Sequence, residues 1–103
     1  MKLNKIEKLF ESKAIIRHGV FLLKWSDAIE FVDECENRQI KILGVDAFFL
    51  DEKNIQPSLE HSVDFTSKSY IKKDVSNYDY ARRLIEKKKD MYFEIVIDSP
   101  EIK

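Results

Sequence analysis

The hydrophobic and polar residues of this chain follow helical spacing in some segments and strand spacing in others. Near the amino end, Leu3, Ile6, Leu9 and Phe10 recur with the period of a short amphipathic helix. Residues 14–24 contain a glycine and several β-branched residues, and they predict an irregular connection with room for a brief strand. The first quarter of the chain is therefore expected to be mainly helix and loop.

Two further helices are predicted, each introduced by a capping residue. Ser26 or Asp27 can cap the second helix, and Glu30 completes a capping box after Asp27. Ser76 or Asn77 can cap the third. The apolar residues that these helices should bury are Ala28, Ile29, Val32 and Cys35 in the second and Ala81, Leu84 and Ile85 in the third.

Three segments have the pattern of β-strands. Residues 40–50 are apolar on both alternating faces, which is typical of an interior strand, and Gly44 indicates a bulge. A turn at residues 51–54 leads through Pro57 to a segment that alternates strictly between residues 58 and 66, so the two strands should pair as a hairpin. After a polar loop at residues 69–77 and the third helix, residues 91–98 form the last strand, which Pro100 ends.

The order of these elements predicts an α+β fold in one domain. We expect a small mixed or antiparallel sheet of three to four strands, with two to three helices packed on one face. The 103 residues are one domain of ordinary size, which we assign to residues 1–103. The second face of such a sheet is open to water.

The alternating segment has an unusual polar side. The residues that alternate are Leu59, His61, Val63 and Phe65 on the predicted buried side and Ser58, Glu60, Ser62, Asp64 and Thr66 on the other. No Lys or Arg lies between Lys53 and Lys68, although both residue types are frequent in the chain. The exposed side of this strand should therefore present only hydroxyl and carboxylate groups.

Charge is segregated along the chain despite a net charge of only −1. Residues 26–67 hold ten Asp and Glu against three Lys and Arg. In the second helix Asp27, Glu30 and Glu34 form one acidic stripe opposite the apolar face. Two interpretations stay open: a solvated helix face with acids favourable at its amino end, or a surface that attracts a basic partner.

Composition excludes several classes of protein. The longest apolar runs are too short to cross a bilayer, and charged residues interrupt the amino end, unlike a signal peptide. Cys35 is the only cysteine, which excludes an internal disulfide and fits a reducing compartment. We therefore expect a cytoplasmic protein that does not contact a membrane.

No catalytic, metal or cofactor site is predicted. The two histidines and the single cysteine lack metal-ligand spacing, and two glycines cannot form a phosphate-binding loop. On a strand, His61 would point away from Glu60 and Asp64. The basic residues 82–83 and 87–89 are explained by the negative carboxyl end of a helix, so direct nucleic-acid binding is not expected.

Three segments nevertheless resemble a known group of proteins. Residues 28–31 (Ala-Ile-Glu-Phe), 42–49 (Ile-Leu-Gly-Val-Asp-Ala-Phe-Phe) and 55–65 are similar to small bacterial immunity proteins. These include the inhibitors of tRNA-cleaving colicins and the immunity protein 40 family of polymorphic-toxin and contact-dependent growth inhibition systems. The resemblance covers residues 26–98 and contains no catalytic signature.

The resemblance implies a toxin inhibitor rather than an enzyme. Its partner would be the C-terminal nuclease domain of a cognate toxin, whose basic cleft binds phosphates, in a 1:1 complex. The residues that would enter this cleft are Asp46, Asp51, Glu52, Glu60, Ser62 and Asp64, with Asp27, Glu30 and Glu34 as a weaker set. Two alternatives remain: a small cytoplasmic ribonuclease-type enzyme or toxin that uses His61 and the basic helix, and a generic protein-interaction module.

Overall fold

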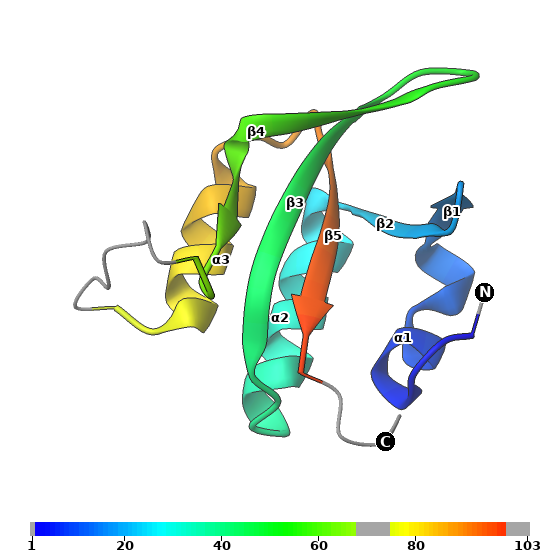
Figure 1. Cartoon of the computed structure of the whole chain (residues 1–103). Coiled ribbons are helices and arrows are strands. Elements are labelled where there is room, and N and C mark those ends of the chain that lie inside the picture. The colour runs from blue at the N-terminus through cyan, green and yellow to red at the C-terminus, as the bar shows by residue number, and fades with distance from the viewer. Residues whose placement is uncertain (1, 68–74, 99–103) are drawn as a thin grey trace.

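A computed structural model of the chain, in which residues 2–67 and 75–98 are described, has an α+β fold (Figure 1). The helices are α1 (Lys5–Leu9), α2 (Trp25–Asn37) and α3 (Asn77–Glu86), with a short 3-10 turn, η1 (Glu11–Lys13). The strands are β1 (Ile15–Arg17), β2 (Val20–Lys24), β3 (Ile42–Leu50), β4 (Ile55–Asp64) and β5 (Tyr92–Ile97). Most of the predicted loop at residues 69–77, and Pro100, lie outside the described residues.

The five strands form one antiparallel sheet in the order β1-β2-β5-β3-β4. Helices α2 and α3 lie on one face of this sheet, and in Figure 1 the strands β3 and β5 pass in front of α2, with α3 beside β4. Among residues 2–67 and 75–98, no helix of comparable length lies across the opposite face. The predicted α+β class is confirmed.

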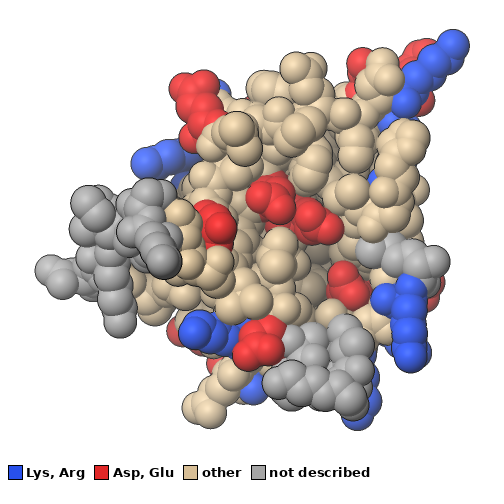
Figure 2. Space-filling model, viewed as in Figure 1, with Lys and Arg blue, Asp and Glu red and all other residues tan. Residues whose placement is uncertain are grey.

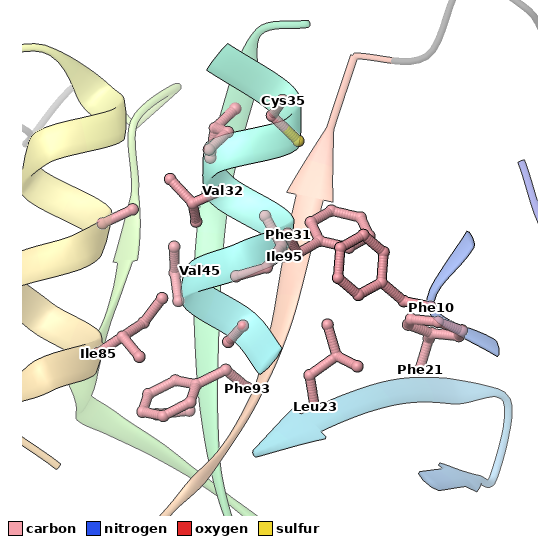
Figure 3. Close-up of a cluster of buried hydrophobic side chains, with 14 of the residues drawn as sticks. Phe10, Phe21, Leu23, Phe31, Val32, Cys35, Val45, Ile85, Phe93 and Ile95 are labelled. Carbon is pink, nitrogen blue, oxygen red and sulfur yellow. The ribbon is translucent and has the colours of Figure 1, made fainter. Parts of the chain in front are cut away.

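The core lies between α2, α3 and the sheet (Figure 3). Helix α2 contributes residues at the i, i+3, i+4, i+7 spacing of an amphipathic helix, all of them buried. Phe31 of this set is almost fully buried and contacts the ring of Phe10, with 5.2 Å between ring centroids. The core residues of this face are Ala28, Phe31, Val32 and Cys35, opposite Val45, Phe93 and Ile95 of the sheet and Ile85 of α3.

The sheet has five strands rather than the three to four predicted, because residues 15–24 form a β-hairpin. His18 and Gly19, which join β1 to β2, have φ angles of 52° and 75°. Two central residues with positive φ match the right-handed twist of the flanking strands, so the chain reverses in two residues. A His-Gly pair is a weaker turn signal than Asn-Gly, and the hairpin was missed.

The ends of α2 and α3 correct one predicted cap and confirm another. Helix α2 begins at Trp25 after Lys24, without a side-chain cap, so the predicted cap at Ser26 or Asp27 is wrong. At its other end, the Ile40 N–H donates to the Cys35 carbonyl at 2.8 Å and Gln39 has positive φ, as in a Schellman motif. Helix α3 is capped by Ser76, whose Oγ accepts the Asp79 N–H at 3.1 Å.

A wide bulge interrupts β4, and the predicted strict alternation is wrong there. Val63 pairs with Val45 and Ser58 with Ala47, so residues 59–62 lie opposite one residue of β3. The Ser62 Oγ accepts the Ala47 N–H at 2.9 Å and donates to the Ser58 carbonyl at 2.6 Å. This hydroxyl takes the place of a backbone partner and closes the bulge. Leu59, predicted to face the core, is therefore 89% exposed.

Candidate functional site

The antiparallel register places two acidic residues directly opposite each other on the open sheet face. Asp46 of β3 pairs with Glu94 of β5, while their neighbours Val45 and Ile95 pair on the core side. On the other side of β3, Asp64 of β4 pairs with Gly44. We call Asp46, Asp64 and Glu94 the sheet-face carboxylates. Figure 2 shows carboxylate groups at the centre of this face, surrounded by uncharged residues.

Gly44 allows the strands that bear these groups to approach closely. A Cβ atom at this position would lie 2.9 Å from the backbone oxygen of Val63, closer than ordinary contact. A shallow depression of about 320 Å³ remains between β3, β4 and β5, and Asp46 and Asp64 both line it. The site is therefore a hollowed part of the sheet rather than a flat surface.

Partial burial and like charge oppose ionisation of the central pair. Burial raises the pKa of Asp46, and the charge of Asp64 adds to this effect, whereas a hydrogen bond from Glu94 works against it. The pKa of Glu94 is raised by burial first, then by the charges of Asp46 and Glu7 and by the hydrogen bond to Asp46. The pair therefore holds a proton more readily than separate carboxyl groups would, with Glu94 as the donor to Asp46.

Asp64 is held in its charged form by local hydrogen bonds. Its Oδ1 accepts the Thr66 O–H at 2.6 Å and the Thr66 N–H at 2.9 Å. These bonds lower the pKa of Asp64, because they are made to the carboxylate. The Ser67 backbone N–H lowers the pKa further, so the side chain is fixed at the edge of the depression.

Within the described part of the chain, no Lys or Arg forms an ion pair with any sheet-face carboxylate. None of the three groups therefore has a neutralising cation among residues 2–67 and 75–98. Because two of them are also partly removed from water, their charge is poorly compensated. Such a surface is complementary to basic groups supplied from outside the chain.

The acidic stripe of α2, predicted as a second partner surface, is neutralised within the chain. Lys13 of η1 lies 2.9 Å from the Glu30 carboxylate and 3.9 Å from that of Asp27. Arg38 pairs with Glu34 at 2.8 Å. Residues 26–37 contain no Lys or Arg, but cations from other segments compensate the negative charge of the helix.

Arg82 of α3 neutralises the remaining acids of α2. Its Nε lies 2.8 Å from Asp33, and its two terminal nitrogens contact Glu36 and Asp79. The Arg82 side chain is 22% exposed, so the guanidinium is enclosed by these carboxylates. This ion-pair cluster joins the two helices.

Two other predicted residues lie in the β3–β4 turn, which extends beyond the rest of the sheet (Figure 1). The Asp51 Oδ1 accepts the Lys53 and Asn54 N–H groups at 3.0 and 2.8 Å, which lowers the pKa of Asp51. Its carbonyl oxygen accepts a hydrogen bond from Arg17. Asp51 therefore closes the turn, whereas Glu52 is exposed.

The last two predicted residues belong to the β4 bulge. Ser62 makes the internal hydrogen bonds of the bulge. Glu60 is exposed, as predicted, but it lines a separate cleft with His61 and α3. Of the six residues predicted for one surface, the structure brings only Asp46 and Asp64 together.

Glu94 is the functional candidate that sequence reasoning missed. It alternates with the buried residues Phe93 and Ile95, so its strand pattern alone places it on the open face. Its pairing with Asp46 depends on the β3–β5 register, which shifts between Ile42 and Gly44 at a bulge. The bulge predicted near Gly44 is thus confirmed, but its effect on the register was not predictable.

Comparison with known proteins adds no relative: no protein-family model matches the chain, and no curated protein matches its sequence. No helix among residues 2–67 and 75–98 is long and apolar enough to span a membrane. The same residues contain no group of three or more His, Cys, Asp or Glu side chains arranged to hold a metal ion. A function must therefore be argued from the surface itself.

Proposed function

We propose that the protein is an immunity protein that binds the nuclease domain of a cognate bacterial toxin and occludes its active site. The sheet-face carboxylates Asp46, Asp64 and Glu94 would enter the basic cleft of the nuclease. The observation that carries the proposal is their lack of any cation partner among the described residues, in contrast to the neutralised acids of α2. The resemblance to immunity proteins supports the same function.

Physical chemistry favours an Arg or Lys as the group that meets these carboxylates. A nuclease needs basic side chains in its cleft because phosphate contacts dominate its affinity for nucleic acid. An Arg guanidinium has a planar fork of donors that can bind a carboxylate through two hydrogen bonds. Inserted between Asp46 and Asp64, it would neutralise charges that oppose each other in the free protein.

The surroundings of the carboxylates also suit a protein partner. Val96, which pairs with Gly44 next to Asp64, is 38% exposed and lines the same depression. Apolar area around a few charges is the usual composition of an interface centre, from which water is excluded on binding. The sheet face thus offers both charge complementarity and contact area.

A ribonuclease-type enzyme remains the second candidate, and one observation favours it. The cleft beside the β4 bulge brings Glu60 and His61 together with Arg83, Lys87 and Lys88. Ribonuclease chemistry would further need a second acid–base group, and His18 lies in the β1–β2 turn, at the opposite edge of the sheet from β4. Cleavage of tRNA or other RNA by the purified protein, lost in His61→Ala, would replace our proposal with this function.

The proposal is tested by protection of cells that express the toxin domain encoded beside this protein. We expect the variant Asp46→Asn/Asp64→Asn/Glu94→Gln to lose protection. The matched control Asp27→Asn/Glu30→Gln/Glu34→Gln removes the same number of charges from α2 and should protect like the wild type. Full protection by the first variant, at equal protein level, would exclude the sheet face as the inhibitory surface.

A further inference from the structure

A second site lies between the β4 bulge and α3, at the edge of the sheet. It is a cleft of about 520 Å³, within the range of small-molecule sites. Its charged and polar lining comprises Glu60, His61, Tyr80, Arg83, Lys87 and Lys88. The cleft is separate from the depression between Asp46 and Asp64, with which it shares no lining residue.

Helical spacing explains why cations gather in this cleft. Tyr80, Arg83, Leu84 and Lys87 are spaced i, i+3, i+4, i+7, so they lie on one side of α3 and its carboxyl end. Ala81 and Ile85 lie on the buried side instead. The helix therefore presents one stripe to the core and another to the cleft.

Two consecutive arginines of α3 have different surroundings as a result. Arg82 points towards α2 and is enclosed by three carboxylates. Arg83 lines the cleft, and across residues 2–67 and 75–98 no ion pair joins it, Lys87 or Lys88 to an acid. The described residues thus provide three cations at one cavity, none of them in an ion pair with a described acid.

The charge balance of the cleft favours a doubly charged anion. The carboxyl end of α3 contributes about half a negative charge, and Glu60 contributes one more. These are outweighed by Arg83, Lys87 and Lys88. Arg can bind a phosphate through two parallel hydrogen bonds, and Lys is a common phosphate ligand as a point charge. A phosphate monoester dianion matches both the charge and the donor types.

The rest of the lining indicates an organic body attached to the phosphate. Val75, Leu84 and the ring of Tyr80 provide apolar surface, and the volume exceeds what inorganic phosphate alone requires. The Ser62 hydroxyl fixes the bulge that bears Glu60 and His61, so one wall is already formed. Glu60 can accept a hydrogen bond from a ligand hydroxyl or amine, but it would repel the successive phosphates of an RNA strand.

We propose that this cleft binds a phosphate monoester with a planar organic body, such as a 5′-mononucleotide, with its phosphate at Arg83, Lys87 and Lys88. This site is independent of the proposed toxin interface. Either proposal can fail without the other, because their residues and their probes differ.

The test is a titration of the ¹⁵N-labelled full-length protein, followed by NMR. Adenosine 5′-monophosphate should cause saturable shifts at residues 59–62 and 83–88, inorganic phosphate weaker shifts at the same residues, and adenosine none. Arg83→Gln/Lys87→Gln should weaken nucleotide binding at least about tenfold, since hydrogen bonds to charged groups are among the stronger ones. If the NMR spectrum shows that the double variant is misfolded, the single substitution Lys87→Gln, at an exposed side chain, replaces it. This variant should weaken binding severalfold.

Lys89→Gln is the matched control, because Lys89 belongs to the same basic run but its ammonium lies over the Trp25 ring, 4.6 Å from the centroid. It should bind the nucleotide like the wild type. An equal loss of nucleotide affinity in Lys89→Gln and in the double variant would show that binding depends only on net charge. That result would overturn the proposal. So would the absence of saturable shifts, or tighter binding of a short RNA oligonucleotide at the same residues.

Discussion

The outer side of α2 and the open face of the sheet both carry several carboxylates, but they differ in where the compensating cations lie. Asp33 and Glu36 of α2 share the guanidinium of Arg82, which is 49 residues from Asp33 in sequence. Asp46 and Glu94 face each other, and Asp46 lines the depression, without an ion-pair partner among the described residues. An acidic segment of sequence is therefore not an acidic surface until the fold has placed the basic residues.

The two regions should also differ in what they contribute to folding. In general, exposed ion pairs contribute about 0–1 kcal/mol each, and clusters contribute more. Like charges directly opposite on a sheet are destabilising by a similar amount. The acids of α2 thus support the fold, whereas those of the sheet face weaken it and are explained better by a role in binding.

The largest effect on stability is expected from Gly44→Ala. This substitution disturbs the strands that bear the sheet-face carboxylates and leaves α2 unchanged. The added Cβ would lie 2.9 Å from the Val63 backbone oxygen, so β4 must move. Overpacking of this kind costs about 1–3 kcal/mol, which urea unfolding would measure. An unchanged free energy of unfolding would show that β3 and β4 do not approach as described.

A smaller loss is expected from Arg82→Gln, which breaks the ion pairs of α2. The variant leaves Asp33, Glu36 and Asp79 without their shared cation, at a cost of about 1 kcal/mol that shrinks as salt is added. Arg83→Gln is the control, since Arg83 has no ion pair among the described residues, and should change the free energy of unfolding by less than about 0.5 kcal/mol. Equal losses in both variants would remove the contrast between the two arginines.

The smallest effect, and the opposite sign, is expected from Glu94→Gln. Burial, aided by the charge of Asp46, raises the pKa of Glu94, and burial raises that of Asp46. At pH values between the ordinary and the raised pKa values, the native state binds more protons than the unfolded chain. The stability of the wild type therefore falls as the pH rises through this range. Removing one charge should raise the free energy of unfolding at neutral pH by a few tenths of a kcal/mol and flatten this fall. A loss of stability that is constant with pH would contradict like-charge repulsion at this pair.

Local periodicity predicted much of the fold. The helix at Lys5–Leu9, the interior strand at Ile42–Leu50, the turn after it and the last strand all follow from spacing within a few residues. The hairpin at β1 and β2 was missed because its two turn residues, His18 and Gly19, are an uncommon pair for that geometry. Strand β4 was predicted to alternate without interruption, because a local sequence pattern does not show that the Ser62 hydroxyl replaces a backbone partner.

The candidate site was less predictable than the fold, because it depends on contacts between distant residues. Asp46 and Asp64 were identified by their residue type and strand position. Glu94 required the β3–β5 register, and the ion pairs of Glu30 and Glu34 required the positions of Lys13 and Arg38. Charge counted along the sequence therefore indicated acidic residues correctly but not which of them remain unpaired.

The dissociation constant of the complex with the toxin domain tests the central claim most directly. Asp46→Asn/Asp64→Asn/Glu94→Gln should weaken binding by about 2–5 kcal/mol, mainly through faster dissociation, if these groups are buried against Arg or Lys. Asp27→Asn/Glu30→Gln/Glu34→Gln should change the dissociation constant less than tenfold, about 1.4 kcal/mol. The reverse order, with tight binding by the sheet-face variant and loss by the α2 variant, would contradict the account.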